Sequence, residues 1–256
     1  MIAVARCLVL GLLALSGVGV LAGCGDEDSR ADERDGSEAV VVHGSADLAR
    51  LLTRMRPPVP IRAAPVPLDR LGESAPADGI VLTEDHLFPA LPEEGFARSG
   101  LVAQDRIVLA VDADAPDRPR SVSDLGPDDP IAIATGDGRT ATAVRALLER
   151  PQSEDGRRLA RRPQDAVPST ERALAEVAAG RADAAVVLHS DLTPAVRRRS
   201  GLAEVGIVDD DELYVQVAVG RGSADDARRD ELLRWLTGTP GRRAFEQAGF
   251  EPPPPQ

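Results

Sequence analysis

Residues 171–188 read ERALAEVAAGRADAAVVL and join two patterns within one short stretch. In the first half, Ala173, Leu174 and Val177 fall on one face of a helix. The second half ends in a short apolar run, residues 184–188, which predicts a buried strand. A helix that leads directly into a strand is the repeating unit of α/β domains, so this stretch predicts the fold class.

The same alternation continues in both directions along the chain. Ser45 is well placed as the N-cap of a helix over residues 46–55. The alternation predicts parallel α/β sheets, and 256 residues fit one large domain or two lobes of about 100 residues each. Further strands are predicted at residues 39–42, 59–63, 80–82, 106–111, 131–134 and 214–219, and further helices around 84–91, 140–149, 225–236 and 241–248.

The composition limits the kinds of partner that the chain can have. It carries 42 acidic and 30 basic residues, a formal net charge of −12, and only 2% aromatic residues. An acidic surface repels phosphates, and few rings are available to stack on bases, so nucleic acid is not an expected partner. The same scarcity of rings disfavours sugar binding.

The N-terminus has the pattern of a secreted lipoprotein. Arg6 precedes an uncharged run over residues 7–22, which is shorter than the about 20 residues of a membrane-spanning helix and suits a secretory signal. The run ends in Leu21-Ala22-Gly23-Cys24, which resembles the lipobox of bacterial lipoproteins. We expect residues 1–23 to be the signal peptide and Cys24 to carry the lipid. An ordinary signal peptide or a short anchor is the alternative.

The segment after this cysteine predicts how the folded part is held. Residues 24–38 are rich in acids and contain no large apolar residue, which is typical of a flexible tether. A solvated charge run with no further role is the alternative. The protein is therefore expected to be extracytoplasmic and lipid-anchored to the outer face of the cytoplasmic membrane.

No motif for catalysis accompanies the α/β pattern. His43, His86 and His189 lack the close spacing of metal ligands, and the sequence has no CxxC, GxSxG or P-loop motif. We therefore expect no enzyme activity, no cofactor and no metal site. A tethered, secreted α/β protein without a catalytic motif indicates solute capture.

Five stretches stand in order along the chain: APAD at 75–78, DRIVLAV at 105–111, SVSDL at 121–125, GRADAAVV at 180–187 followed by Ser190-Asp191, and PGRRAFEQAGFEP at 240–252. Together they resemble the molybdate-binding periplasmic proteins of ABC importers. The resemblance implies a two-lobed, type II periplasmic-binding-protein (venus-flytrap) fold with hinge crossover strands. Residues 39–107 plus 216–256 would form lobe 1, and residues 108–215 would form lobe 2.

The resemblance also implies the ligand and the partners. The ligand would be a tetrahedral oxyanion of the molybdate or tungstate type, held by backbone N–H groups, hydroxyls and helix N-termini. The protein would be a monomer that delivers this anion to an ABC transporter permease. By the same resemblance, the ligand contacts fall at Gly44, Ser45, Gly138, Arg139, Thr140 and Thr170.

The chain departs from the family pattern at several of its ligand positions. Ala64 and Pro65 stand where a second ligand serine would fall, and Leu188 stands where a ligand tyrosine would fall, so two hydroxyl donors are absent. Arg139 replaces a small residue, and its guanidinium either binds the anion or points to solvent. Ser45 matches the first ligand serine, with a plain helix N-cap as the alternative.

Two other functions stay open at this point. One is a receptor for divalent metal ions, because His43, His86 and His189 each follow a predicted strand, where cleft residues of open α/β sheets lie. The other is a transport-incompetent sensor or interaction lipoprotein whose cleft has decayed.

Overall fold

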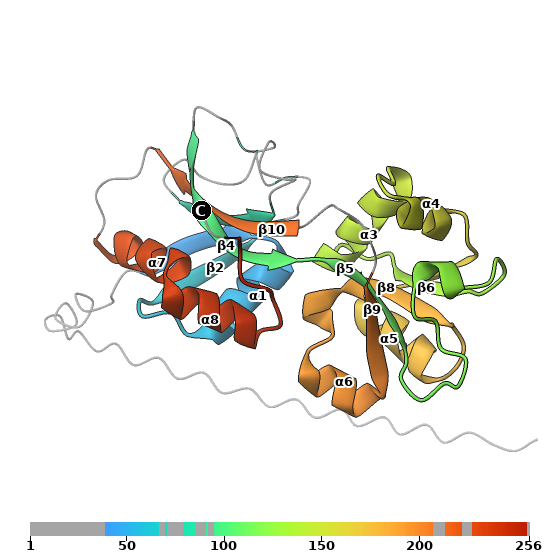
Figure 1. Cartoon of the computed structure of the whole chain (residues 1–256). Helices are drawn as coiled ribbons and strands as arrows, with labels where there is room; N and C mark the ends of the chain where they lie inside the picture. The colour runs from blue at the N-terminus through green and yellow to red at the C-terminus, as the bar shows by residue number, and fades with distance from the viewer. Residues whose placement is uncertain are drawn as a thin grey trace, which may run out of the picture. The chain divides into compact units, whose positions relative to one another are not determined.

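The computed structural model describes residues 39–66, 70, 79–84, 91, 95–206, 213–221 and 227–254. In this part of the chain, strands and helices alternate and build two five-stranded sheets (Figure 1). The predicted α/β class is confirmed. Several features predicted from the sequence lie outside the described residues: the signal peptide, the tether with Cys24, the APAD stretch at 75–78, and residues 85–90 of the helix predicted around 84–91, with His86.

The first sheet has the strand order β2-β1-β3-β10-β4. Its strand β1 (Val40–Gly44) pairs in parallel with β2 (Ile61–Pro65) and with β3 (Ile80–Glu84). Strand β10 (Leu213–Gly220) runs antiparallel to β3 and to β4 (Phe96–Asp105). The sheet is therefore mixed and not parallel throughout, because a late part of the chain returns and inserts between β3 and β4.

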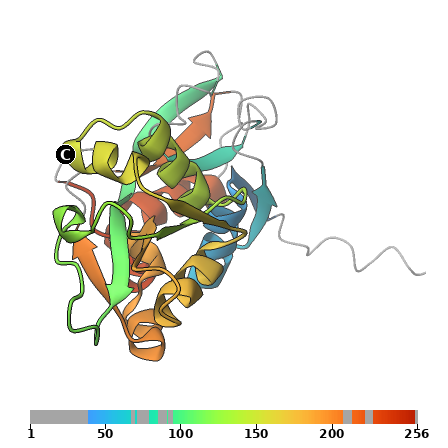
Figure 2. The ribbon, with the colours of Figure 1, turned by 90° about the vertical axis from the view of Figure 1, so that its right-hand side faces the viewer.

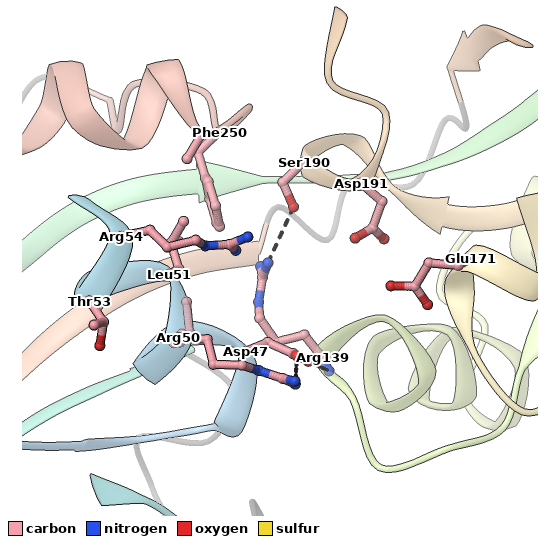
Figure 3. Close-up of a pocket in the computed structure, with 12 residues that line it drawn as sticks. Asp47, Arg50, Leu51, Thr53, Arg54, Arg139, Glu171, Ser190, Asp191 and Phe250 are labelled. Atoms are coloured by element: carbon pink, nitrogen blue, oxygen red, sulfur yellow. Dashed lines mark hydrogen bonds and ion pairs between the residues drawn. The ribbon is translucent and has the colours of Figure 1, made fainter. Parts of the chain in front are cut away.

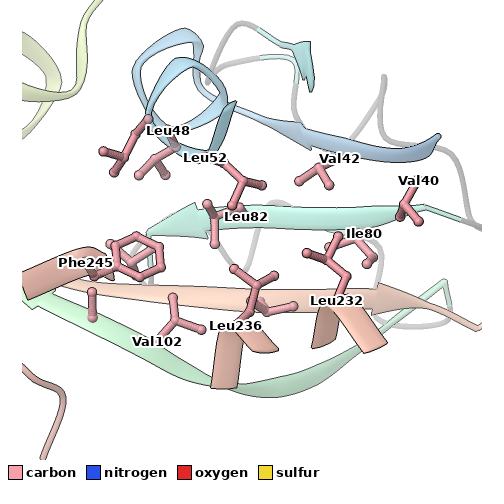
Figure 4. Packing of buried hydrophobic residues seen from close by; sticks show 14 of the residues in the cluster. Val40, Val42, Leu48, Leu52, Ile80, Leu82, Val102, Leu232, Leu236 and Phe245 are labelled. Atoms are coloured by element: carbon pink, nitrogen blue, oxygen red, sulfur yellow. The ribbon is translucent and has the colours of Figure 1, made fainter. Parts of the chain in front are cut away.

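Three helices cover one face of this sheet: α1 (Ala46–Met55), α7 (Ala227–Thr237) and α8 (Thr239–Gln247). Strands β1, β3 and β10 contribute every second residue to this core, as the two-residue period of a strand requires. Leucines of α1 and α7 and one phenylalanine of α8 fill the space above them (Figure 4). The residues labelled there are Val40, Val42, Leu48, Leu52, Ile80, Leu82, Val102, Leu232, Leu236 and Phe245.

The second sheet has the strand order β7-β6-β8-β5-β9. Strand β6 (Ile131–Ala134) is parallel to β7 (Gln164–Val167) and to β8 (Ala184–Leu188). Strand β5 (Ile107–Asp112) is antiparallel to β8 and to β9 (Leu202–Gly206). This sheet is mixed as well.

Helices cover both faces of the second sheet (Figure 1 and Figure 2). On one face lie α3 (Arg139–Glu149) and α4 (Glu154–Ala160), and on the other lie α5 (Thr170–Ala178) and α6 (Pro194–Ser200). The first five residues of β5 are buried, since alternate side chains enter the two cores. Burial on both faces explains why β5 and β8 read as continuous apolar runs.

The chain passes from one sheet to the other at Arg106, between the end of β4 and the start of β5. At the same place the segment after α8 returns, and the backbones of Glu251 and Gln104 exchange two hydrogen bonds of 2.9 Å. Both sheets belong to one compact unit, residues 38–256. The lobe boundaries proposed from the sequence stay a prediction. None of the helices in the described ranges is long and apolar enough to cross a membrane.

Candidate functional site

A cavity of about 530 Å³ lies beside α1, where residues of both sheets' helices and loops meet. In Figure 3, the side chains of α1 border one side of the space, and Asp191 and Glu171 border the other. The cavity therefore combines charges of both signs with a small apolar part. Its lining consists of Asp47, Leu48, Arg50, Leu51, Thr53, Arg54, Arg139, Glu171, Ser190, Asp191, Ala248 and Phe250.

Helix α1 supplies most of one wall. Asp47, Arg50, Leu51 and Arg54 are spaced three and four residues apart, which brings them to one face of the helix. Ser45 starts the helix, because its Oγ accepts the N–H of Leu48 at 3.3 Å as an N-cap. The cap places Asp47 in the first turn, where a negative charge is favourable.

The opposite wall is organised around Arg139, the first residue of α3. Its Nη2 atom lies 2.9 Å from Oδ2 of Asp105 at the end of β4, and the two side chains are only 6% and 0% exposed. Its guanidinium carbon lies 4.9 Å from the ring centre of Phe250, and its Nη1 atom lies 3.3 Å from Oγ of Ser190. Arg139 is therefore buried and ion-paired, and it is not solvated.

Asp105 is buried but fully provided with hydrogen-bond donors. Besides Arg139, it accepts the Ser190 hydroxyl at 2.7 Å, the Ser190 N–H at 3.2 Å and the Arg106 N–H at 2.9 Å. A buried carboxylate is tolerated only with such compensation. The ion pair thus links the end of β4, the start of α3 and the short 3₁₀ helix η4 (His189–Asp191).

Asp191 accepts a hydrogen bond from Thr140, the second residue of α3. Its Oδ2 atom accepts the Thr140 hydroxyl at 2.6 Å and the Leu188 N–H at 3.1 Å. Burial raises the pKa of Asp191 to about 6, although the hydrogen bond from Thr140 and the charge of Arg139 act to lower it. This carboxyl group therefore titrates closer to neutral pH than an ordinary aspartate.

Three donors of α3 are thus bound by carboxylates of the same chain. The backbone N–H of Arg139 donates to Asp47 at 3.0 Å, its guanidinium to Asp105, and the Thr140 hydroxyl to Asp191. We give the name Arg139 cluster to Asp47, Asp105, Arg139, Thr140, Ser190 and Asp191. Two of its members, Arg139 and Thr140, are positions that the resemblance assigned to the solute anion.

The structure places the six predicted ligand residues around the cavity, but only Arg139 is part of its lining. Ser45 and Gly138 are the N-caps of α1 and α3, and Thr170 is the first residue of α5. Gly44 ends β1, where a Cβ atom would lie 2.6 Å from the carbonyl oxygen of Leu82, so the close approach of β3 requires glycine. The binding roles of these residues stay predictions.

Sequence reasoning missed several lining residues. Asp47, Arg50 and Arg54 carry a signal, since their spacing of three and four residues brings these charged side chains to one face of α1. Ser190 and Asp191 belong to a stretch that resembles the family, but neither was assigned a role from the sequence. Phe250 is brought to the site by the turn at Gly249, whose φ of +99° favours glycine.

The described residues contain no group of three or more His, Cys, Asp or Glu side chains that could hold a metal ion. His189 is engaged elsewhere, because its Nδ1 atom lies 2.9 Å from Oε2 of Glu204. His43 is buried, with 9% of its surface exposed. These positions give no support to a metal receptor built on the two histidines.

The chain belongs to the family of bacterial extracellular solute-binding proteins, whose family model matches residues 39–251. This family consists of binding proteins that act outside the cytoplasm. No curated protein compared with the chain gives a significant match.

Solved structures share the fold at low sequence identity. One is the substrate-binding domain of a protein provisionally assigned as a molybdenum ABC transporter from Clostridium difficile (15% identity, TM-score 0.59, covering 84% of this chain and 99% of that one). A second is an ancestral cationic amino acid solute-binding protein (20%, 0.57, covering 82% and 95%). A third is an ABC transporter protein from Clostridium perfringens (14%, 0.56, covering 83% and 84%). The type II periplasmic-binding-protein fold is thereby confirmed.

Proposed function

We propose that the protein is the substrate-binding lipoprotein of an ABC importer and captures a small oxyanion of the molybdate or tungstate type in the cavity beside α1. The observation that carries this proposal is the presence of two exposed arginines of α1, Arg50 and Arg54, in the cavity lining. Guanidinium groups bind oxyanions through paired hydrogen bonds. Among the described residues, the side chain of Arg54 makes no ion pair or hydrogen bond, so its guanidinium is available to a solute.

Family and fold support the transport role. The chain belongs to an extracellular solute-binding family, and a solved neighbour with a TM-score of 0.59 is assigned to molybdenum transport. We infer a monomer that docks on a transporter permease. Its two lobes, residues 39–107 plus 216–256 and residues 108–215, would close on the anion about the strands that cross near Arg106.

A titration with single oxyanions tests the proposed ligand. The full chain, purified in detergent, is titrated by calorimetry with molybdate, tungstate, sulfate, phosphate and chromate, each alone, and with zinc as a separate arm. Binding of one oxyanion with micromolar or tighter affinity supports the proposal. Binding of zinc alone would support the metal receptor, and no heat from any ion would favour a decayed cleft.

Arg54 offers a matched mutational test. A hydrogen bond to a charged group contributes about 1.5–3 kcal/mol, so Arg54→Gln should weaken oxyanion binding about tenfold or more. Arg234, in the last turn of α7 as Arg54 is in the last turn of α1, lies outside the cavity. Arg234→Gln should leave affinity unchanged. Equal affinities of the two variants would remove Arg54 from the site.

Anchoring by Cys24 is proposed from the lipobox and has its own test. Labelled palmitate should enter the wild-type protein, and Cys24→Ser should abolish the label and leave unprocessed precursor. A labelled Cys24→Ser protein would contradict the anchor.

A further inference from the structure

The carboxylate of Asp47 bridges two helices that border the cavity. Its Oδ2 atom accepts the backbone N–H of Arg139, the first residue of α3, at 3.0 Å. Its Oδ1 atom accepts Nη2 of Arg50 at 2.7 Å. A residue of α1 therefore supplies the negative group at the N-terminus of α3.

Helix α3 provides no such group itself. Its N-cap is Gly138, which has no side chain to accept a hydrogen bond, and its first turn contains no acidic residue. A Cβ atom on Gly138 would lie 3.1 Å from Oδ2 of Asp47, so the carboxylate lies directly against the glycine. The unpaired N–H groups and the positive end of a helix dipole favour an anion at this position. Asp47 fills it.

We propose that Asp47 is an internal competitor for the solute anion: its carboxylate holds the N-terminus of α3 in the empty protein, and an oxyanion binds there by displacing it. This inference rests on the proposed function, because it takes the solute to be an oxyanion. It makes Asp47 the residue that decides which anions the cavity accepts, since a weakly hydrogen-bonding anion cannot replace a carboxylate that is already in place.

The surroundings of the three carboxylates show why Asp47 is the exchangeable one. The side chain of Asp47 is 40% exposed, and that of its partner Arg50 is 72% exposed, so both can turn outward without unpacking a core. Asp105 is 0% exposed and accepts four hydrogen bonds. Asp191 is held by Thr140 and by the backbone of Leu188. Displacement of Asp47 would also free Arg50 to contact the solute.

Removal of the charge on Asp47 tests the inference. Asp47→Asn in the full chain should bind the best oxyanion of the panel at least tenfold more tightly than the wild type, in calorimetry at fixed ionic strength. Asp230→Asn is the matched control, because Asp230 lies in the first turn of α7 and outside the cavity, and its affinity should stay within twofold of wild type. Asp47→Ser, which shortens the side chain as well, should show the same gain.

A readout without ligand keeps the test independent of solute identity. In the empty protein, the amide proton of Arg139 should exchange with solvent faster in Asp47→Ser than in Asp230→Asn, as measured by NMR. Unchanged exchange at Arg139 would overturn the inference.

The outcomes separate the inference from the proposed function. If the wild type binds an oxyanion and Asp47→Asn binds it equally or more weakly, the inference fails and the proposed function stands. If only Asp47→Asn binds an oxyanion, no oxyanion displaces the carboxylate in the wild type, so the proposed function fails and the inference fails with it. If neither protein binds any of the tested oxyanions, both are overturned.

Discussion

Arg139 carries a full charge in a place that solvent hardly reaches. Its side chain is 6% exposed, and that of Asp105, with which it pairs at 2.9 Å, is 0% exposed. The ring of Phe250 covers the guanidinium. Removing one partner of such a pair leaves a buried charge without compensation, which costs more than the pair itself contributes. Arg139 therefore has a structural role whether or not it touches a solute.

Arg139→Ala should destabilise the empty protein by about 3–5 kcal/mol, because Asp105 stays buried without its cation. The free energy of unfolding from urea titrations measures this loss. Arg145→Ala is the control, since Arg145 lies exposed on the same helix, and the change there should be below about 0.5 kcal/mol. Equal stabilities of the two variants would show that the Arg139–Asp105 pair does not stabilise the fold.

The raised pKa of Asp191 predicts that the stability of the protein depends on pH. Its pKa is raised to about 6 in the folded protein, chiefly by burial, from a reference value of 3.8. Between these values the folded state binds a proton that the unfolded state has released, so the contribution of Asp191 to stability falls as pH rises from about 4 to 6. Asp191→Asn should reduce this fall, and Asp230→Asn should not. Urea titrations at pH 4 and pH 7 compare the slopes.

The surroundings of Arg139 were not readable from the sequence. The sequence placed it at the start of a helix and left it either bound to the anion or solvated. Its partner Asp105 is 34 positions away, and Phe250 lies after the last helix. Local periodicity predicts which side of an element is apolar, but it does not predict which distant charge meets it.

Among the elements, α1 was predicted with the bounds that the structure shows. Ser45 marks its start, and Leu48, Leu51 and Leu52 give a clear helical period. Strand β4 was not predicted, because its sequence FARSGLVAQD lacks a steady alternation. It contains Gly100 at φ +153°, and its pairing with β10 shifts register twice. That strand exists through its partner in the sheet, which lies more than a hundred residues further along the chain.

Mutation of Ser45, at the start of α1, distinguishes a helix N-cap from a ligand contact. Ser45→Ala and Ser153→Ala each remove an N-cap hydroxyl, which should cost about 1 kcal/mol of stability. Ser153 caps α4, outside the cavity lining. If Ser45 also binds the solute, only Ser45→Ala should weaken oxyanion binding, by about tenfold. Equal affinities of the two variants would make Ser45 a cap alone, with melting curves as the check on stability.

In the whole molecule, the sequence pattern predicted the class and the resemblance predicted the type II fold. The pattern alone predicted parallel sheets, whereas each sheet contains antiparallel strands. Those strands arise because the chain crosses between the sheets and returns, and local alternation of helix and strand carries no information on such returns. The family resemblance does carry information on these returns, because it compares the order of segments over most of the chain.

Arg106 lies where the chain crosses and connects segments of both sheets. Its Nε atom lies 2.8 Å from Oε1 of Glu251, whose backbone pairs with β4, and its Nη2 atom lies 2.6 Å from Oε1 of Glu204 in β9. Burial acts to lower the pKa of Arg106, but the hydrogen bond and charge of Glu251 and the charge of Glu204 outweigh it, so the pKa is raised. The ion pairs with Glu251 and Glu204 thus connect Arg106 to a segment of each sheet.

Arg106→Gln should weaken this connection and let the two sheets move apart more easily in the empty protein. The loss of stability should be about 1 kcal/mol, because the side chain is 37% exposed, and it should shrink in high salt as screening weakens the wild-type pairs. The radius of gyration from small-angle scattering should rise in the variant and fall again with bound ligand. Arg158→Gln breaks an exposed ion pair with Glu154 within α4 and should leave the radius unchanged. Equal radii for the two variants would mean that Arg106 does not restrain the crossing.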